Sequence, residues 1–313
     1  MSILAQTPNA ARAVEQRSEV RMRSVAHRRR IGSLLTVLTW CAAALAVLPL
    51  LAILTHLVLG GARALTLDFF VRVPAPAGIA GGGMANATVG TIILVGIASL
   101  IGIPIGLGAG LFVAERSETR LAESVRFVAD VLSGLPSIVL GILVWELVVR
   151  QSGRFSGLAG GIALGLLIVP LVTRATEEMV KLVPRELAES ALALGFPRWR
   201  TSLVIVLRTA MPGIVTATLV AVARAAGETA PLLFTAFGNA YWSLDATRPM
   251  AALPLQIYAY ALSPYDEWRG QAWAGALVLL VLITLMSLLA RAVLRARTSL
   301  SRGARPRAHE TDA

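Results

Sequence analysis

Long apolar stretches alternate with short polar segments along the chain. Four long runs without a charged residue cover 31–59, 73–114, 155–173 and 270–290. A membrane-crossing helix needs roughly 20 mostly apolar residues, because about 30 Å of hydrocarbon is crossed at about 1.5 Å per residue. Most of the four runs reach that length. The pattern predicts an all-α, polytopic membrane protein with six transmembrane helices, at 32–59, 87–114, 127–149, 156–174, 212–237 and 270–293.

The segment between the first two predicted helices has the composition of a loop. It contains Pro74, Pro76 and a glycine triplet that ends at Gly83, and such residues interrupt regular structure. Asn86 follows, and asparagine is a favoured N-cap residue. We therefore expect the second helix to start near Asn86.

The composition excludes an ordinary soluble enzyme. Hydrophobic residues make up 56% and charged residues 15% of the 313 residues, whereas a soluble domain carries about 25% charged residues. We divide the chain into a basic tail (1–31), a membrane domain (32–293) and a C-terminal tail (294–313). The first apolar run exceeds a signal-peptide core of about 7–15 residues, so we expect it to remain as the first span.

Basic residues indicate how the helices are oriented. With a cytoplasmic N-terminus, the inner segments hold 22 arginine and lysine residues and the outer segments hold six. Cytoplasmic loops of membrane proteins are enriched in these residues. We therefore expect a multi-pass membrane protein with both termini in the cytoplasm. The net charge is +11. Because the basic residues lie between apolar runs, we expect them to interact with anionic membrane lipid and not with nucleic acid.

The chain lacks the residue patterns of a soluble catalytic site. His27, His56 and His309 have no companion ligands at metal-binding spacing. The only lysine, Lys181, is followed by leucine, so the P-loop pattern G-x-x-x-x-G-K-[ST] is absent. We therefore expect no catalytic residue, metal or cofactor, and any ATP hydrolysis falls to a partner.

Ionisable residues inside the predicted fifth helix point to a polar pathway. Arg224 lies twelve residues beyond Pro212, hence about 18 Å into the membrane, and a guanidinium there stays protonated. Glu228 follows one turn later on the same helix face. Such groups cost roughly 2.5–3.5 kcal/mol each at the membrane centre. We expect Arg224 to face a pathway for an anion while Glu228 holds it in place; the alternative is a structural ion pair between them, or with a neighbouring helix.

Three further ionisable residues lie near the ends of predicted spans. Asp130 and Glu146 lie near opposite ends of the predicted third helix, and Asp130 either pairs with an arginine or lines the inner mouth of the pathway. A charge near a helix end more often reaches the membrane interface. Arg174, which ends the predicted fourth helix, is expected to extend its guanidinium to that interface.

The inner segment 174–211 carries a short amphipathic pattern. The apolar positions predict a helix from Arg185 to Leu194 with one apolar face. Gly195 and Pro197 end this helix, and a second helical stretch leads into the fifth span. A short amphipathic helix of this kind lies on the membrane or docks in a groove of a cytoplasmic partner.

The same inner segment resembles a known family. E-S-A-L-A-L-G, at 189–195, resembles the E-A-A-x-x-x-G loop of the membrane subunits of binding-protein-dependent ABC importers. The isoleucine and leucine that follow in the family match Ile205 and Leu207. Two positions depart from the pattern, since Ser190 replaces the first alanine and Arg208 stands where the family has proline.

Further segments resemble the PstA-type phosphate-permease branch of this family, and the resemblance extends over about 60–293. The segments are P-A-P-A-G with G-G-G-M-A-N-A-T-V-G-T (74–91), I-G-I-P-I-G (101–106), D-V-L-S-G-L-P-S-I-V (130–139), A-L-A-L-G-F-P-R-W-R-T (191–201) and A-R-A-A-G-E-T-A-P-L-L-F-T (223–235).

The resemblance implies a type I ABC importer permease bundle at 32–293, located in the inner membrane, that works in a larger complex. It implies a second homologous permease subunit, two ATP-binding subunits below the membrane and a periplasmic phosphate-binding protein above it. It makes 174–211 a coupling loop inserted into the ATPase, and it places the family's fifth-span arginine and glutamate at Arg224 and Glu228. The coupling positions are Glu186, Glu189, Ala191, Gly195, Pro197 and Arg198.

Three functional classes stay open on the sequence. The first is the permease subunit of an ATP-driven phosphate importer. The second carries sulfate, molybdate or phosphonate with the same architecture, since one arginine does not set this selectivity. The third is a non-transport scaffold or sensor. The inner segment 174–211 argues against this class, because a scaffold does not need a segment that docks with an ATPase. A self-sufficient secondary transporter lacks support, since the chain shows no convincing pair of inverted repeats.

Overall fold

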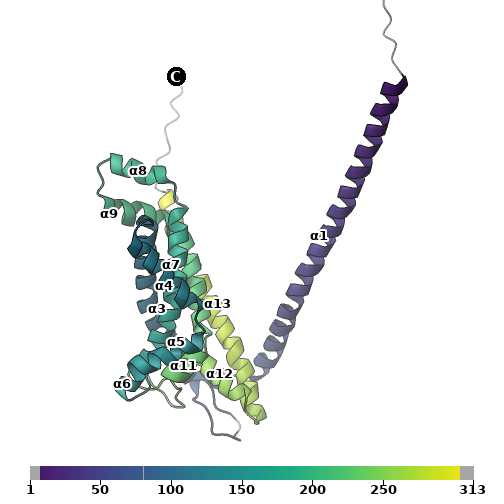
Figure 1. Ribbon diagram of the computed structural model, residues 1–313. Helices are drawn as coiled ribbons and strands as arrows, with labels where there is room; N and C mark the ends of the chain where they lie inside the picture. Colours follow the sequence, from purple (N-terminus) through teal and green to yellow (C-terminus); the bar gives the residue numbers. More distant parts are fainter. Residues whose placement is uncertain (1–7, 80, 304–313) are drawn as a thin grey trace, which may run out of the picture. The chain divides into compact units, whose positions relative to one another are not determined.

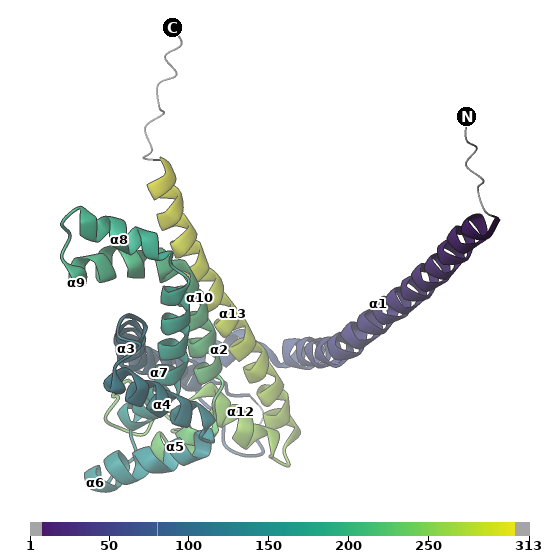
Figure 2. The same ribbon diagram turned by 45° about the horizontal axis from the view of Figure 1, so that its top comes forward.

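The computed structural model describes residues 8–79 and 81–303. Two compact units divide the chain, Met1–Val58 and Leu59–Ala313. Helix α1 (Pro8–Ala64) supplies the described residues of the first unit, and its last residues, from Leu59 on, belong to the second. The helix of the first span therefore continues back into the predicted basic tail. The remaining helices belong to the second unit, and their arrangement within it can be followed in Figures 1 and 2.

The second unit is built from helices of very different length. They are α2 (Leu67–Val71), α3 (Ala85–Glu115), α4 (Arg120–Gly134), α5 (Ser137–Val144), α6 (Arg150–Ser152), α7 (Gly157–Lys181), α8 (Arg185–Ala193), α9 (Arg198–Arg200), α10 (Leu207–Ala226), α11 (Ala230–Thr235), α12 (Leu253–Ala261) and α13 (Asp266–Gly303). Two π-helical turns, Trp145–Val149 and Thr201–Val206, join α5 to α6 and α9 to α10. The described residues contain no β-strand beyond one isolated bridge between Phe237 and Met250, which confirms the all-α prediction.

Among the described residues, five helical stretches are long and apolar enough to cross a membrane. A bent pair, Arg120–Gly134 with Ser137–Ser152, brings the number to six when it is counted as one span. The five are Gly32–Ala64, Ala85–Glu115, Gly157–Lys181, Arg198–Ala226 and Asp266–Leu288. This agrees with the six predicted spans.

The third span is not the continuous helix predicted at 127–149. Its two halves meet at an angle of 107°. Pro136 explains the break, because a proline donates no backbone hydrogen bond and forces the preceding residue out of the helical region. Leu135 accordingly has extended backbone angles, φ −71° and ψ 135°.

The fifth predicted helix, 212–237, is also wrong at its C-terminal end. Helix α10 stops at Ala226, and the separate short helix α11 begins at Ala230. Gly227 has low helix propensity, and Pro231 cannot donate the backbone hydrogen bond that a continuous helix would require. At the other end the helix begins earlier than predicted, since Arg198–Ala226 runs without a break.

Helices α3 and α7 pack closely through a row of glycines on α3. A Cβ at Gly102, Gly106 or Gly110 would lie 2.8, 2.7 or 2.5 Å from a side-chain atom of α7. Small residues spaced four apart allow this close approach of membrane helices. The contact continues into a buried cluster that includes Leu94, Ile168 and Leu232 and that anchors α3, α7 and α11 in one body.

The start of α3 differs from the sequence prediction. The helix begins at Ala85 after the N-cap residue Met84, so Asn86 is not the cap. The Asn86 side chain instead donates a hydrogen bond of 2.7 Å to the carbonyl of Asn239. This buried amide therefore ties α3 to the loop that follows α11.

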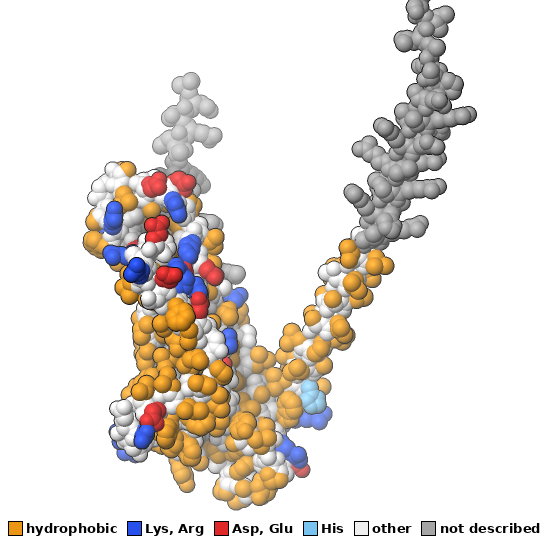
Figure 3. All heavy atoms as spheres, in the orientation of Figure 1, with side chains coloured by type: hydrophobic (Ala, Val, Ile, Leu, Met, Phe, Trp, Pro, Cys, Tyr) orange, Lys and Arg blue, Asp and Glu red, His pale blue; other side chains and the backbone are white. Residues whose placement is uncertain are grey.

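Charged and apolar side chains separate along the second unit. Figure 3 shows lysine, arginine, aspartate and glutamate side chains gathered at the end that carries α8 and α9, whereas hydrophobic side chains cover the middle of the bundle. Leu100, Phe127 and Val220 are examples of large apolar side chains that are more than half exposed on this unit. Such a surface suits a hydrocarbon environment.

Candidate functional site

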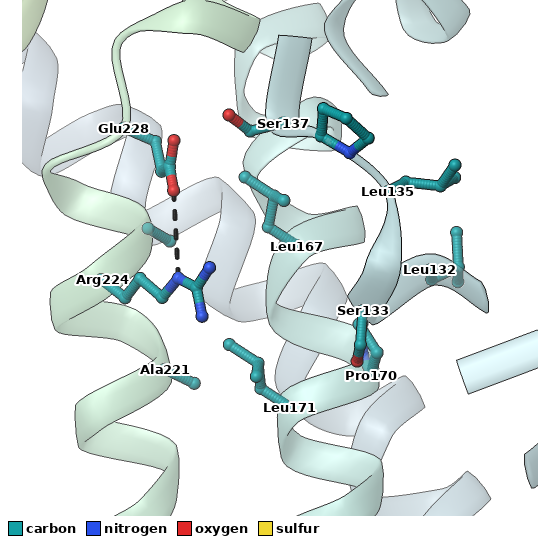
Figure 4. A pocket seen from close by; sticks show the side chains of 12 residues that line it. Leu132, Ser133, Leu135, Ser137, Leu167, Pro170, Leu171, Ala221, Arg224 and Glu228 are labelled. Atoms are coloured by element: carbon teal, nitrogen blue, oxygen red, sulfur yellow. Dashed lines mark ion pairs between the residues drawn. The ribbon is translucent and has the colours of Figure 1, made fainter. Parts of the chain in front are cut away.

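A cavity of about 150 Å³ lies where two interrupted spans meet. One wall comes from the break between α4 and α5, and the opposite wall comes from the last turn of α10 and the residues that follow it. Helix α7 contributes the apolar floor (Figure 4). The lining residues are Leu132, Ser133, Leu135, Pro136, Ser137, Leu167, Pro170, Leu171, Ala221, Arg224, Ala225 and Glu228.

Arg224 and Glu228 lie together on one wall of this cavity. Arg224 Nε is 3.9 Å from Glu228 Oε1, and the two side chains are 67% and 22% exposed. The prediction that both lie on one face of the same helix is wrong, because α10 ends at Ala226. The turn at Gly227 nevertheless keeps Glu228 within ion-pair distance of Arg224.

The opposite wall presents polar groups to this pair. Ser133 and Ser137 line the cavity on either side of the helix break. Figure 4 shows them across Leu167 and Leu171 from Arg224 and Glu228. Helix α5 begins at Ser137, and the N-terminus of a helix favours negative charge. Both breaks in the spans thus contribute polar groups to one cavity with apolar surroundings, a suitable setting for a small anion.

Asp130 does not line this cavity. It pairs with Arg174, whose Nε lies 2.9 Å from Asp130 Oδ1. The predicted fourth helix ended at Arg174, whereas α7 continues to Lys181, so Arg174 lies within the helix and bonds two carboxylates rather than extending alone to an interface. A role for Asp130 in the pathway stays a prediction.

Sequence reasoning missed Glu177, the centre of a buried ionic cluster. Its side chain is 2% exposed and accepts hydrogen bonds from Arg126 Nε at 2.9 Å, Lys181 Nζ at 2.6 Å and Arg174 at 3.2 Å. The spacings to Arg174 and Lys181 are those of helical neighbours and were visible in the sequence. Arg126 belongs to α4, so the cluster joins α4 to α7.

The inner segment folds as a helical hairpin between α7 and α10. Helix α8 spans Arg185–Ala193, which confirms the predicted helix within one residue. Phe196 N–H donates to Ala191 O at 3.1 Å and Gly195 N–H donates to Leu192 O at 2.9 Å, the Schellman pattern. Gly195 has φ +85°, which explains why a glycine ends this helix.

The hairpin exposes apolar and charged side chains together. Leu187, Leu194 and Trp199 are 45%, 78% and 66% exposed, whereas Ala191 is 4% exposed. The predicted apolar face is therefore divided, with Ala191 packed inward and both leucines outward. Five of the six coupling positions predicted from the family resemblance are also exposed, namely Glu186, Glu189, Gly195, Pro197 and Arg198. Exposed apolar residues rimmed by charge are typical of a protein-docking surface.

The part of the chain that the structure describes contains no group of three or more histidine, cysteine, aspartate or glutamate residues placed to hold a metal ion. The cationic group at the cavity is Arg224. The site can therefore attract an anion through a guanidinium and hydroxyl groups.

Spanning helices around a cavity with a cationic side chain define a membrane component of a transport system. Residues 102–299 match the family described as the binding-protein-dependent transport system inner membrane component, and the chain belongs to this family. Membership makes the chain a multi-pass inner membrane protein and a transport subunit rather than an enzyme. It also implies a partner permease, ATPase subunits and a substrate-binding protein.

The relatives within the family are more specific. The phosphate transport system permease protein PstA of Yersinia pestis is 44% identical over 276 residues, which cover 88% of this chain and 94% of that protein. The protein of the same name from Xylella fastidiosa (strain Temecula1) is 46% identical over 236 residues, 75% of this chain and 82% of that protein.

A solved structure shows the same fold. An inward-facing form of the MetNI methionine ABC transporter superimposes with a TM-score of 0.55 at 19% identity, covering 68% of this chain and 96% of that chain. This likeness confirms the predicted importer-type permease bundle.

Proposed function

We propose that this chain is a permease subunit of an ATP-driven phosphate importer, and that it forms the translocation pathway with a second, homologous permease subunit. The observation that carries the proposal is Arg224 at a cavity between two interrupted spans, in a chain whose relatives are named as phosphate permeases. A guanidinium offers a planar set of donors that suits a phosphate oxyanion.

The chemistry of the cavity fits transient passage better than tight binding. Arg224 supplies one positive charge, and Glu228 offsets part of it at 3.9 Å. A pathway must attract an ion strongly enough to admit it and weakly enough to release it. One partly neutralised arginine lowers the barrier for an oxyanion in hydrocarbon without trapping it.

The two ends of the bundle are the proposed docking sites for the ATP-binding subunits and for the binding protein. The hairpin of α8 and α9 is the proposed docking element for two ATP-binding subunits, with Glu186, Glu189, Ala191, Gly195, Pro197 and Arg198 as coupling positions. Both termini then lie in the cytoplasm, and a periplasmic phosphate-binding protein delivers the anion on the opposite side. ATP-driven movement of the docked subunits would shift the bundle between outward and inward openings.

Replacement of Arg224 tests the proposal. In the assembled complex, reconstituted with its binding protein, Arg224→Ala should lower phosphate uptake at least about tenfold, the cost of losing charge-assisted hydrogen bonds. Arg224→Lys, which keeps the charge, should retain more uptake. Arg248→Ala serves as control, since Arg248 pairs with Asp245 outside the cavity. Full uptake by an assembled Arg224→Ala complex would refute the role of this arginine.

Competition distinguishes phosphate from other oxyanions. Unlabelled phosphate, sulfate, molybdate or phosphonate is added, one at a time, in excess over radiolabelled phosphate outside the proteoliposomes. Phosphate alone should compete if the complex imports phosphate. Stronger competition by another oxyanion would assign that anion as the substrate.

A further inference from the structure

Glu228 is the one carboxylate among the residues that line the cavity. The distance of 3.9 Å to Arg224 Nε exceeds hydrogen-bond length, and none of the described residues donates a hydrogen bond to this carboxylate. Its side chain is 22% exposed. An anion in the cavity would therefore meet a partly buried acceptor with free lone pairs, which repels any oxyanion that lacks a hydrogen.

Tetrahedral oxyanions differ in this respect. Phosphate and arsenate at neutral pH carry at least one hydroxyl group, whereas sulfate carries none. An ionised carboxylate only accepts hydrogen bonds. The hydroxyl of a hydrogen phosphate ion can donate to Glu228, and the oxygens of sulfate can only repel it.

The other groups of the cavity complete a site for such an ion. Ser133 and Ser137 have no hydrogen-bond partner among the described residues, so both hydroxyls are available as donors together with the guanidinium of Arg224. The volume of about 150 Å³ corresponds to about five water molecules. This is room for one tetrahedral oxyanion.

We propose that Glu228 accepts a hydrogen bond from the hydroxyl of a protonated oxyanion held by Arg224, and that it thereby selects hydrogen phosphate over sulfate within the membrane. The inference rests on the proposed function and deepens it. Sites built to bind a substrate hydroxyl reject analogues that lack it, because the protein group is left unpaired. Selection at Glu228 would act in addition to selection by the binding protein.

The test uses the complete complex in proteoliposomes with its binding protein delivering radiolabelled phosphate. Unlabelled phosphate, arsenate or sulfate is added on the ATPase side, and the half-inhibitory concentration of each is measured. The wild-type complex should be inhibited by phosphate and arsenate at much lower concentration than by sulfate. The ratio of the sulfate value to the phosphate value reports selection at the cavity rather than at the binding protein.

Two substitutions of Glu228 separate its charge from its size. Glu228→Gln should lower the sulfate-to-phosphate ratio at least about tenfold, since an amide can donate to sulfate and still accept from phosphate. Glu228→Asp should keep the preference for phosphate. Glu146→Gln is the matched control, because Glu146 pairs with Arg150 away from the cavity, and its ratio should equal that of the wild type.

The outcomes separate this inference from the proposed function. A wild-type ratio in an active Glu228→Gln complex overturns the inference and leaves phosphate import through Arg224 standing. Inhibition by none of the anions in the wild type would show that the cavity binds no oxyanion, so both proposals for the cavity fail. If Glu228→Gln supports no uptake, displacement of bound radiolabelled phosphate from the complex in nanodiscs gives the same ratio, with the same two readings.

Discussion

Glu177→Gln tests whether one buried carboxylate joins α4 to α7. Glutamine keeps the size of the side chain and removes its charge. Arg126, Arg174 and Lys181 would then lose the carboxylate that all three contact. Because α4 ends beside the cavity and α7 forms its floor, this cluster also fixes the spacing between one wall and the floor of the candidate site.

The expected loss of stability follows from the burial of Glu177 and from the exposure of its three cationic partners. Breaking a buried ion pair costs about 3–5 kcal/mol, and Glu177 is 2% exposed. Its three partners are 25%, 34% and 51% exposed, so water can solvate them after the substitution, and the contact with Lys181 is already screened. We therefore expect Glu177→Gln to lower the free energy of unfolding by about 3 kcal/mol, at the low end of that range.

Denaturant unfolding of the purified complex in detergent measures this cost. Glu178→Gln is the matched control, because Glu178 is the exposed neighbour on the same helix, and a surface substitution should change stability by less than about 0.5 kcal/mol. A double-mutant cycle with Arg126→Gln should give a coupling energy of about 1–3 kcal/mol. Equal free energies of unfolding for the Glu177→Gln and Glu178→Gln complexes would refute this reasoning. Strictly additive effects of Glu177→Gln and Arg126→Gln on the free energy of unfolding would also refute it.

The remaining predictions concern packing and coupling. Gly106→Ala should destabilise the complex by about 1–3 kcal/mol, because the new Cβ would lie 2.7 Å from Cβ of Val172; Gly108→Ala, with no atom within 4 Å, is the control in the same unfolding assay. Gly195→Ala should lower stability by about 1–2 kcal/mol, because alanine is strained at φ +85°. It should also raise the number of ATP molecules hydrolysed per phosphate imported, and an unchanged number would contradict a role of Gly195 in coupling. Deletion of 186–195 should abolish ATP-coupled uptake, and retained uptake would remove the docking assignment.

The spans were predictable because membrane thickness imposes a length on every apolar helix. The Schellman end of α8 was predictable for a similar reason, since Gly195 is one of the few residues that adopt a positive φ without strain. These features depend on local sequence and on one external constraint. Neither needs knowledge of which helices touch.

The helix breaks between α4 and α5 and between α10 and α11 were not predicted, because hydropathy describes side-chain polarity and not backbone geometry. Pro136, Gly227 and Pro231 lie within stretches that are apolar on average, so both spans were predicted as continuous helices, although each of the three residues disfavours a helix. The contact between Arg126 and Glu177 could not be predicted, since the two residues are 51 positions apart and meet only when α4 packs on α7. The cavity itself is a product of both breaks, so its second wall at Ser133 and Ser137 was missed as well.

Chemical restoration of charge at position 224 tests the central claim most directly. Cys41 is the only cysteine of the chain, so Cys41→Ser provides a background for Arg224→Cys in the complete complex. We predict that this complex imports little phosphate, that a cationic methanethiosulfonate restores uptake whereas a neutral one does not, and that phosphate slows the modification. Wild-type uptake before modification, or no reaction of position 224 with a water-soluble reagent, would contradict an anion pathway at Arg224.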